Sequence, residues 1–135
     1  MIILGLSDNR IGLEGIAHIA DALRSNKFLK YIALGSNPLT DRGIEALADS
    51  LSMSETLEIL DLYDIKFGDL GGIALANLLN YNKSLHTILI GNTRINAKIG
   101  MSILKSAAYN KNIIDFRWCN LFDVPDADKI PCMFY

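Results

Sequence analysis

The chain has 135 residues, half of them apolar, and carries a formal net charge of −2. This length and composition suit one domain with a buried core and exclude a disordered tail. Because phosphate binding needs a clustered basic excess, the singly scattered lysines and arginines argue against a nucleic-acid partner, and no apolar run approaches the roughly 20 residues of a membrane span.

The first predicted elements are a short strand at residues 4–6 and a helix with an apolar face over residues 16–23. The next unit repeats them as a strand at 31–34, a turn at Asn37–Pro38 and a helix at 43–51. Apolar positions alternate with outward positions in each strand, and apolar residues recur at i, i+3, i+4 and i+7 in each helix. Each unit therefore has one strand and one helix.

The same two elements recur further along the chain. Strands are predicted at 59–62, 87–90 and 115–118, and helices at 72–79 and 103–107. A strand of about three residues and a helix of about three turns cannot bury their apolar faces alone. The units must therefore stack on one another.

A 28-residue period links these units without a change of register. One apolar column comprises Leu6, Leu34, Leu62, Ile90 and Trp118. Stacking gives each such column a neighbour above and below, so the strands form a parallel sheet and the helices pack on its other side. Because a helix is wider than a strand, the stack curves with the sheet on its concave side.

Polar residues occupy both ends of the predicted helices. Thr40 and Asn96 are expected to be N-caps, where a side-chain oxygen accepts a free amide proton. Asn26, Asn82 and Asn110 lie where helices should end, a position that tolerates a left-handed residue.

The second unit carries the pattern Leu-x-x-Leu-x-Leu-x-x-Asn-x-Leu-x-x-x-Gly intact, as Leu29, Ile32, Leu34, Asn37, Leu39 and Gly43. The chain thereby resembles leucine-rich-repeat proteins of the ribonuclease-inhibitor-like subclass. The resemblance covers residues 2–121 and implies an α/β solenoid, a right-handed horseshoe segment whose usual role is to bind other proteins. It divides the chain into a repeat domain at 1–121, with about four full repeats and a fifth strand, and a C-terminal capping tail at 122–135.

The later units depart from the family pattern. The inward asparagine of the family is present as Asn9 and Asn37 and is replaced by Ile65, Thr93 and Leu121. The resulting asparagine ladder is expected to stop midway, and the loops beyond it are expected to be less regular.

The first unit has no predicted neighbour on one side. The apolar residues left without a stacking partner are Leu4, Leu6, Ile11, Ile16 and Leu23. A longer parent chain, self-association or a tolerant first unit would each account for this exposure. The candidate self-association end, through which a homo-oligomer would form, comprises Ile2, Leu4, Leu6 and Ile11.

Strand alternation selects the side chains that face the concavity. One predicted stripe comprises Gly5, Ala33, Asp61, Leu89 and Arg117. The candidate partner-binding residues are Tyr31, Ile59, Asp61, Tyr63, Asp64, Thr87, Leu89 and Arg117. Tyrosines and aliphatic residues beside acids are typical of a protein-binding patch. A plain solvated surface remains the alternative, because every such position needs an outward residue and several of these are small.

Catalytic chemistry has little support in the sequence. Cys119 would need a base to become a thiolate, and His86 is a strand position or more away from it. No metal-ligand spacing, cofactor motif or catalytic set is present. We therefore expect a non-catalytic module that binds another protein in the cytoplasm, of its own cell or of a host cell. The alternatives are a regulator of a GTPase or other enzyme, and a self-associating fragment of a longer repeat protein.

Overall fold

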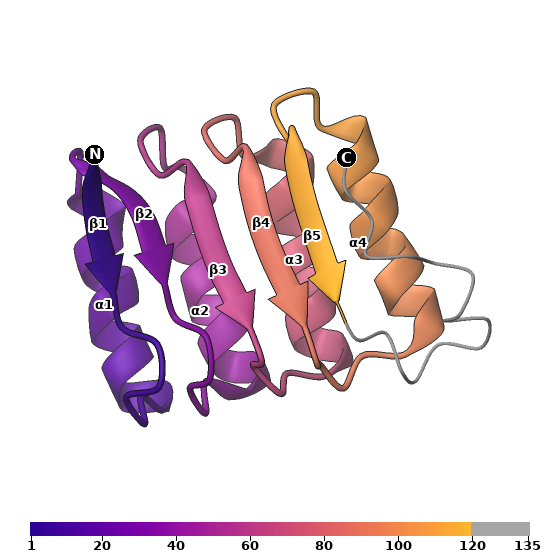
Figure 1. Ribbon diagram of the computed structural model, residues 1–135, viewed down its shortest axis with the longest axis horizontal. Coiled ribbons are helices and arrows are strands. Elements are labelled where there is room, and N and C mark those ends of the chain that lie inside the picture. The colour runs from indigo at the N-terminus through magenta and orange to yellow at the C-terminus, as the bar shows by residue number, and fades with distance from the viewer. Residues whose placement is uncertain (120–135) are drawn as a thin grey trace.

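The computed structural model describes residues 1–119, in which strands and helices alternate along the chain (Figure 1). The strands are β1 (Ile2–Gly5), β2 (Leu29–Ala33), β3 (Ile59–Tyr63), β4 (Thr87–Gly91) and β5 (Asp115–Cys119). The helices are α1 (Leu13–Ser25), α2 (Thr40–Leu51), α3 (Asp69–Tyr81) and α4 (Ala97–Tyr109). Each strand bound lies within two residues of its predicted position. The predicted tail at 122–135 lies outside the described residues.

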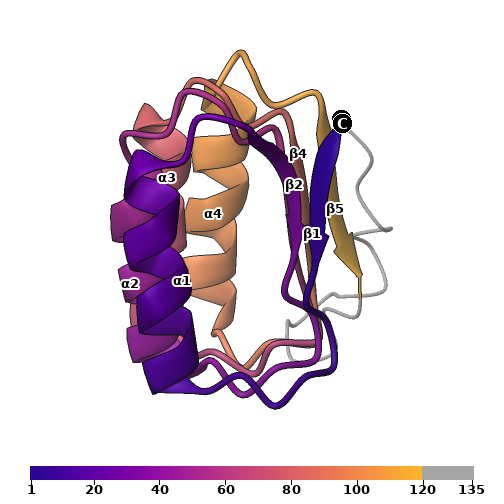
Figure 2. The ribbon, with the colours of Figure 1, turned by 90° about the vertical axis from the view of Figure 1, so that its left-hand side faces the viewer.

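The strands form one parallel sheet in the order β1-β2-β3-β4-β5. Figure 2 shows two layers, with the helices on one side and the sheet on the other. Leu60 lies opposite Ile32 and Ile88, and Ile88 lies opposite Phe116, so each step across the sheet advances 28 residues. The predicted α/β solenoid is confirmed.

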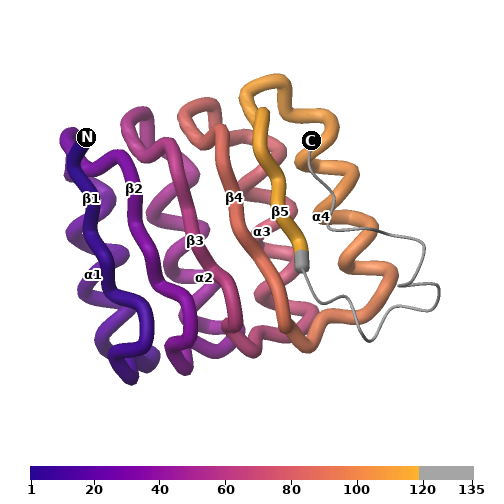
Figure 3. The backbone as a smooth tube through the Cα atoms, in the orientation of Figure 1, coloured from indigo at the N-terminus to yellow at the C-terminus, as the bar shows by residue number. Residues whose placement is uncertain are grey.

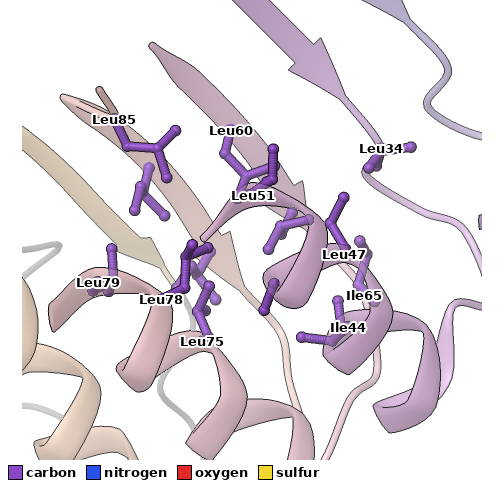
Figure 4. Packing of buried hydrophobic residues seen from close by; sticks show 14 of the residues in the cluster. Leu34, Ile44, Leu47, Leu51, Leu60, Ile65, Leu75, Leu78, Leu79 and Leu85 are labelled. Atoms are coloured by element: carbon purple, nitrogen blue, oxygen red, sulfur yellow. The ribbon is translucent and has the colours of Figure 1, made fainter. Parts of the chain in front are cut away.

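The core lies between the two layers. Leu34, Leu62, Ile90 and Trp118 form an interior row in which no residue is more than 2% exposed. Figure 4 shows leucines of α2 and α3 gathered against residues of the strands. Fully burying one such side chain contributes about 1.5–3 kcal/mol, so the row is a large part of the stability of the stack.

The first helix is better covered than the sequence suggests. Ile16 is fully buried and Leu23 is 7% exposed, so the expectation that both lack cover is wrong. Both residues belong to the core cluster, and α1 packs against α2. Leu6 and Ile11 are only partly buried, as expected for the end of a stack.

Two compensating size changes, at Gly72 and Ile99, keep α3 of the third unit packed against α4 of the fourth. Gly72 stands where earlier helices carry Ile16 and Ile44, and a Cβ added to Gly72 would lie 2.6 Å from Cγ2 of Ile99. Ile99 stands where Gly71 and its counterparts stand in the other units. The isoleucine thus fills the space that the glycine leaves, so the helix spacing is kept without a cavity.

Only one of the two predicted N-caps is present. Asn96 precedes α4, and its side chain accepts a hydrogen bond from the amide of Ile99 at 3.0 Å. Thr40 is instead the first residue of α2, with a positive φ of 58°, so its predicted capping role is wrong. With a positive φ, Thr40 lacks the extended backbone that aims the side-chain oxygen of an N-cap residue at the amides of the first turn.

The asparagines that end the helices are extended rather than left-handed. The φ angles of Asn26, Asn82 and Asn110 are −71°, −68° and −80°, so the prediction of a left-handed residue is wrong. Their side chains close the turn instead. Oδ1 of Asn82 accepts from the amide of Leu85 at 2.7 Å, and its Nδ2 donates to the carbonyl of Leu51 at 2.9 Å. The Nδ2 bonds of Asn82 and Asn110 tie their turns to the preceding unit, whereas the side chain of Asn26 bonds only within its own turn.

Asn37 forms the predicted ladder between the first and second units. Its Oδ1 accepts from the amides of Asn9 and Ile11, both at 3.0 Å. Its Nδ2 donates to the carbonyls of Leu6 at 2.9 Å and Leu34 at 2.8 Å. One buried amide therefore satisfies backbone groups of two successive loops, which is the reason for an asparagine at this position.

The turns that follow the strands share one backbone conformation. Asp8, Ser36, Asp64 and Asn92 have φ angles of 59°, 54°, 57° and 53°. Short polar residues tolerate this left-handed region better than other non-glycine residues do. Although the buried Ile65 replaces the ladder asparagine in the third unit, the predicted loss of regularity is not found at this residue of the later turns.

Candidate protein-binding face

The concave face consists of the strand side chains that point away from the helices. Two columns run across it in register, one through Tyr31, Ile59, Thr87 and Asp115 and the other through Ala33, Asp61, Leu89 and Arg117. Gly5 adds β1 to the second column. Figure 3 shows these strands side by side. With a spacing of about 4.8 Å between strands, the stripe is about 20 Å long.

The alternation between faces follows the sequence prediction. In β3 the inward Leu60 and Leu62 are fully buried, whereas Ile59 and Asp61 are half-buried and Tyr63 is 41% exposed. A strand period of two residues produces this pattern whenever one face meets a core. The outward positions are therefore available to a partner.

Two outward acids make contacts within their own strands. Oδ1 of Asp61 accepts from the amide of Tyr63 at 2.9 Å. Asp115 pairs with Arg117, whose Nη2 lies 2.8 Å from Oδ2 of the carboxylate and whose Nε lies 3.0 Å from Oδ1. Asp115 thereby neutralises the charge of Arg117 on the outward face. An exposed pair of this kind contributes at most about 1 kcal/mol.

Asp64 lies in the turn after β3 and not within the strand. Its carboxylate lies 2.8 Å from Nζ of Lys66 and accepts from Oγ of Ser36 at 3.2 Å. The hydrogen bond from Lys66 lowers the pKa of Asp64, although partial burial opposes the shift. Asp64 therefore supports the turn, and the structure separates it from the strand positions with which it was grouped.

A column of polar, titratable side chains at the amino-terminal ends of β2, β3 and β4 was not predicted from the sequence. Nζ of Lys30 lies 2.8 Å from Oε1 of Glu58, and Nε2 of His86 lies 3.4 Å from Oε2 of the same carboxylate. Nδ1 of His86 also lies 2.9 Å from Oγ1 of Thr87. The hydrogen bond from Lys30 lowers the pKa of Glu58. The 28-residue spacing of Lys30, Glu58 and His86 was the available signal in the sequence.

Cys119 and His86 lie toward opposite ends of the sheet. Cys119 pairs with Gly91, whereas His86 precedes Thr87 at the start of β4. Four residues separate Thr87 from Gly91, which is about 13 Å along a strand. The backbone register therefore keeps His86 away from the strand position of Cys119.

The first strand exposes its apolar side chains. Ile2 and Ile3 are 53% and 58% exposed, and Leu4 is 38% exposed. β1 pairs only with β2, so its other edge carries backbone groups that no strand of residues 1–119 satisfies. Ile3 is in register with Tyr31 and therefore extends the first column of the concave face to β1, at the edge of the sheet. None of the helices within 1–119 is long and apolar enough to cross a membrane.

Comparisons with known proteins agree with this architecture. A family model described as Leucine Rich repeat matches residues 25–48, and no curated protein sequence matches the chain. A solved structure named Leiomodin-1 Actin-Binding Site 2 is similar with a TM-score of 0.80 and 22% sequence identity, over 87% of this chain and 70% of that chain. These findings support a leucine-rich-repeat protein, and its described residues form an α/β leucine-rich-repeat solenoid.

Proposed function

We propose that the chain is a non-catalytic module that binds a partner protein through the concave face. The main support for the proposal is the register of the sheet, which brings the outward residues of five strands into one surface. Its centre combines Tyr31, Ile59, Asp61, Tyr63 and Leu89. Rigid tyrosines and aliphatic side chains beside a few charges are the composition of interface hot spots.

The size of the face indicates how the partner must bind. A strip about 20 Å across the strands and about 16 Å along them covers only some 320 Å². A standard interface buries about 800 Å² on each partner. The partner must therefore also contact loops at the ends of the strands.

Affinity capture with a matched pair of variants tests the proposal. Wild-type chain, a concave variant with Tyr31, Asp61 and Tyr63 changed to Ala, and a helix-face variant with His18, Asn80 and Lys105 changed to Ala are immobilised in parallel. All three helix-face residues are exposed and lie on the opposite layer. The concave variant should lose the partners that the other two retain. Partners retained by the concave variant and lost by the helix-face variant would overturn the proposal.

Actin is a defined probe for the same face. The leiomodin structure is named for an actin-binding site, and its likeness to this chain is one of fold at 22% identity. Co-sedimentation with filamentous actin would make actin a partner if wild-type chain pellets and the concave variant does not. Equal pelleting of both would exclude actin as a partner of the concave face.

The exposed first strand favours a second candidate function, self-association. Ile2, Ile3 and Leu4 would be covered if a second copy packed against β1. Sedimentation velocity across a concentration series tests it, with Leu4→Glu as the disrupting variant. A monomer at about 100 µM would exclude self-association at ordinary concentrations.

Two further assignments follow from the repeat type. The 28-residue unit and full helix favour the ribonuclease-inhibitor-like subclass, and regulation of a GTPase would be one use of the same face. GTP hydrolysis measured with and without the chain tests the latter.

The two cysteines, which form no Cys-x-x-Cys pair, favour a reducing cytosolic compartment.

A further inference from the structure

An open groove lies beside the loops that lead from the strands into α2, α3 and α4. It encloses about 460 Å³ and is lined by Thr40, Asp41, Arg42, Lys66, Gly68 and Arg94. Its three basic side chains come from three successive units of a chain whose net charge is −2. Basic residues that are scattered along the sequence are thus gathered in space.

The carboxylates around this groove are engaged in internal hydrogen bonds. Asp41 accepts from the amide of Gly68. Asp69, in the first turn of α3, accepts from the amide of Asn96 at 2.8 Å. In both cases the acid of one unit holds the start of the next unit. These acids therefore serve the stacking of the repeats.

The two arginines of the groove differ from its lysine, which is ion-paired with Asp64. Arg42 and Arg94 are exposed, and neither guanidinium has a hydrogen-bond or ion-pair partner among residues 1–119, whereas the backbone amide of Arg94 donates to the carbonyl of Phe67. Nζ of Lys66 is held by Oδ1 of Asp64 at 2.8 Å and by the carbonyl of Asn92 at 2.9 Å, which positions its charge at the groove. Each guanidinium offers five N–H donors in a fork that matches a carboxylate.

We propose that this groove binds an acidic segment of a partner protein, with carboxylates paired to Arg42 and Arg94. The two arginines belong to units two strand spacings apart, which is at least about 10 Å. Carboxylates two or three residues apart on an extended segment span about 7–10 Å, so one segment can pair with both arginines at once. Three bases are also too few for the clustered excess that a nucleic acid requires. This site is separate from the concave face.

Fluorescence anisotropy with a fluorescein-labelled octaglutamate peptide tests the proposal, with octaglutamine as the uncharged probe. The groove variant carries Arg42→Glu and Arg94→Glu, and the matched control carries Lys83→Glu and Lys105→Glu, so both change the net charge equally. Octaglutamate should bind wild-type chain more weakly as salt rises, and Kd should increase about tenfold or more in the groove variant and less than twofold in the control.

Additional control measurements separate loss of octaglutamate binding from loss of folding. Thermal denaturation of each variant shows whether it folds, and Arg42→Gln with Arg94→Gln should still weaken octaglutamate severalfold if charge reversal unfolds the chain. The concave variant should bind octaglutamate within twofold of wild type, so that failure here and failure of the proposed function are distinguishable. The proposal would be overturned if octaglutamate did not bind wild type, or if the groove and control variants lost affinity equally. It would also be overturned if single-stranded RNA bound more strongly than octaglutamate, or if millimolar inorganic phosphate competed fully.

Discussion

The ladder residue Asn37 is a buried polar position that joins the first two units. It is 3% exposed, and its single side-chain amide bonds five backbone groups in two loops. Asn37→Ala removes all five bonds while leaving the apolar columns intact. The variant therefore isolates what the polar ladder contributes to the joining of the first two units.

The expected loss follows from the burial of those groups. The bonds to the carbonyls of Leu34 and Gly35 are buried, and the carbonyl of Gly35 would keep a second bond from the amide of Asp8. The bonds to Asn9, Ile11 and Leu6 are partly buried and can be replaced by water. A buried group left unpaired costs about 1–3 kcal/mol, and a replaced bond costs less. We expect the free energy of unfolding to fall by about 3 kcal/mol.

Urea denaturation followed by circular dichroism measures this change. With a slope of about 2 kcal/mol per molar urea, the midpoint of unfolding should fall by about 1.5 M. Asn80→Ala is the matched control, because Asn80 is exposed on α3 and its side chain makes no hydrogen bond among residues 1–119; it should cost less than about 1 kcal/mol. Equal midpoints for the two variants, or a loss below about 0.5 kcal/mol for Asn37→Ala, would refute the reasoning.

Three further predictions concern stability. Gly35→Ala should lower it by about 1–3 kcal/mol, because the added Cβ would lie 2.7 Å from the carbonyl oxygen of Tyr63; an unchanged melting temperature would contradict this. Phe67→Ala should cost about 3–5 kcal/mol in urea denaturation, because Phe67 is fully buried in the core, and a loss below 1 kcal/mol would place it outside. Because Lys66 lowers the pKa of Asp64, the stabilisation from Asp64 should be complete above its ordinary value of 3.8 and disappear as pH falls through the lowered pKa; Asp64→Asn should flatten this acid limb of a stability–pH curve.

The fold is predictable here because burial dictates the apolar columns. Leu34, Leu62 and Ile90 recur at one interval, and a leucine stacked on its own kind has few alternatives that keep it from water. The caps are less predictable, since the same side chain suits several local geometries. Asn82 can tolerate a left-handed backbone or accept amides in an extended one, and the structure has the second.

The concave face was predictable from the sequence, whereas the groove was not. Strand alternation places Asp61 and Tyr63 on the outward face from sequence alone, because the side-chain period is fixed at two. The groove bases could not be grouped in this way. Lys66 and Arg94 occupy equivalent loop positions, but Arg42 reaches them from a helix start, and only the geometry of the turns brings it there.

Site-specific photo-crosslinking tests most directly whether the concave face binds the partner. A photoreactive phenylalanine analogue is placed at Tyr63 in one sample and at Asn80, on the exposed helix layer, in another. The proposed function predicts that the partner isolated by affinity capture forms a covalent adduct with the Tyr63 sample and none with the Asn80 sample. An adduct at Asn80 without one at Tyr63 would contradict it.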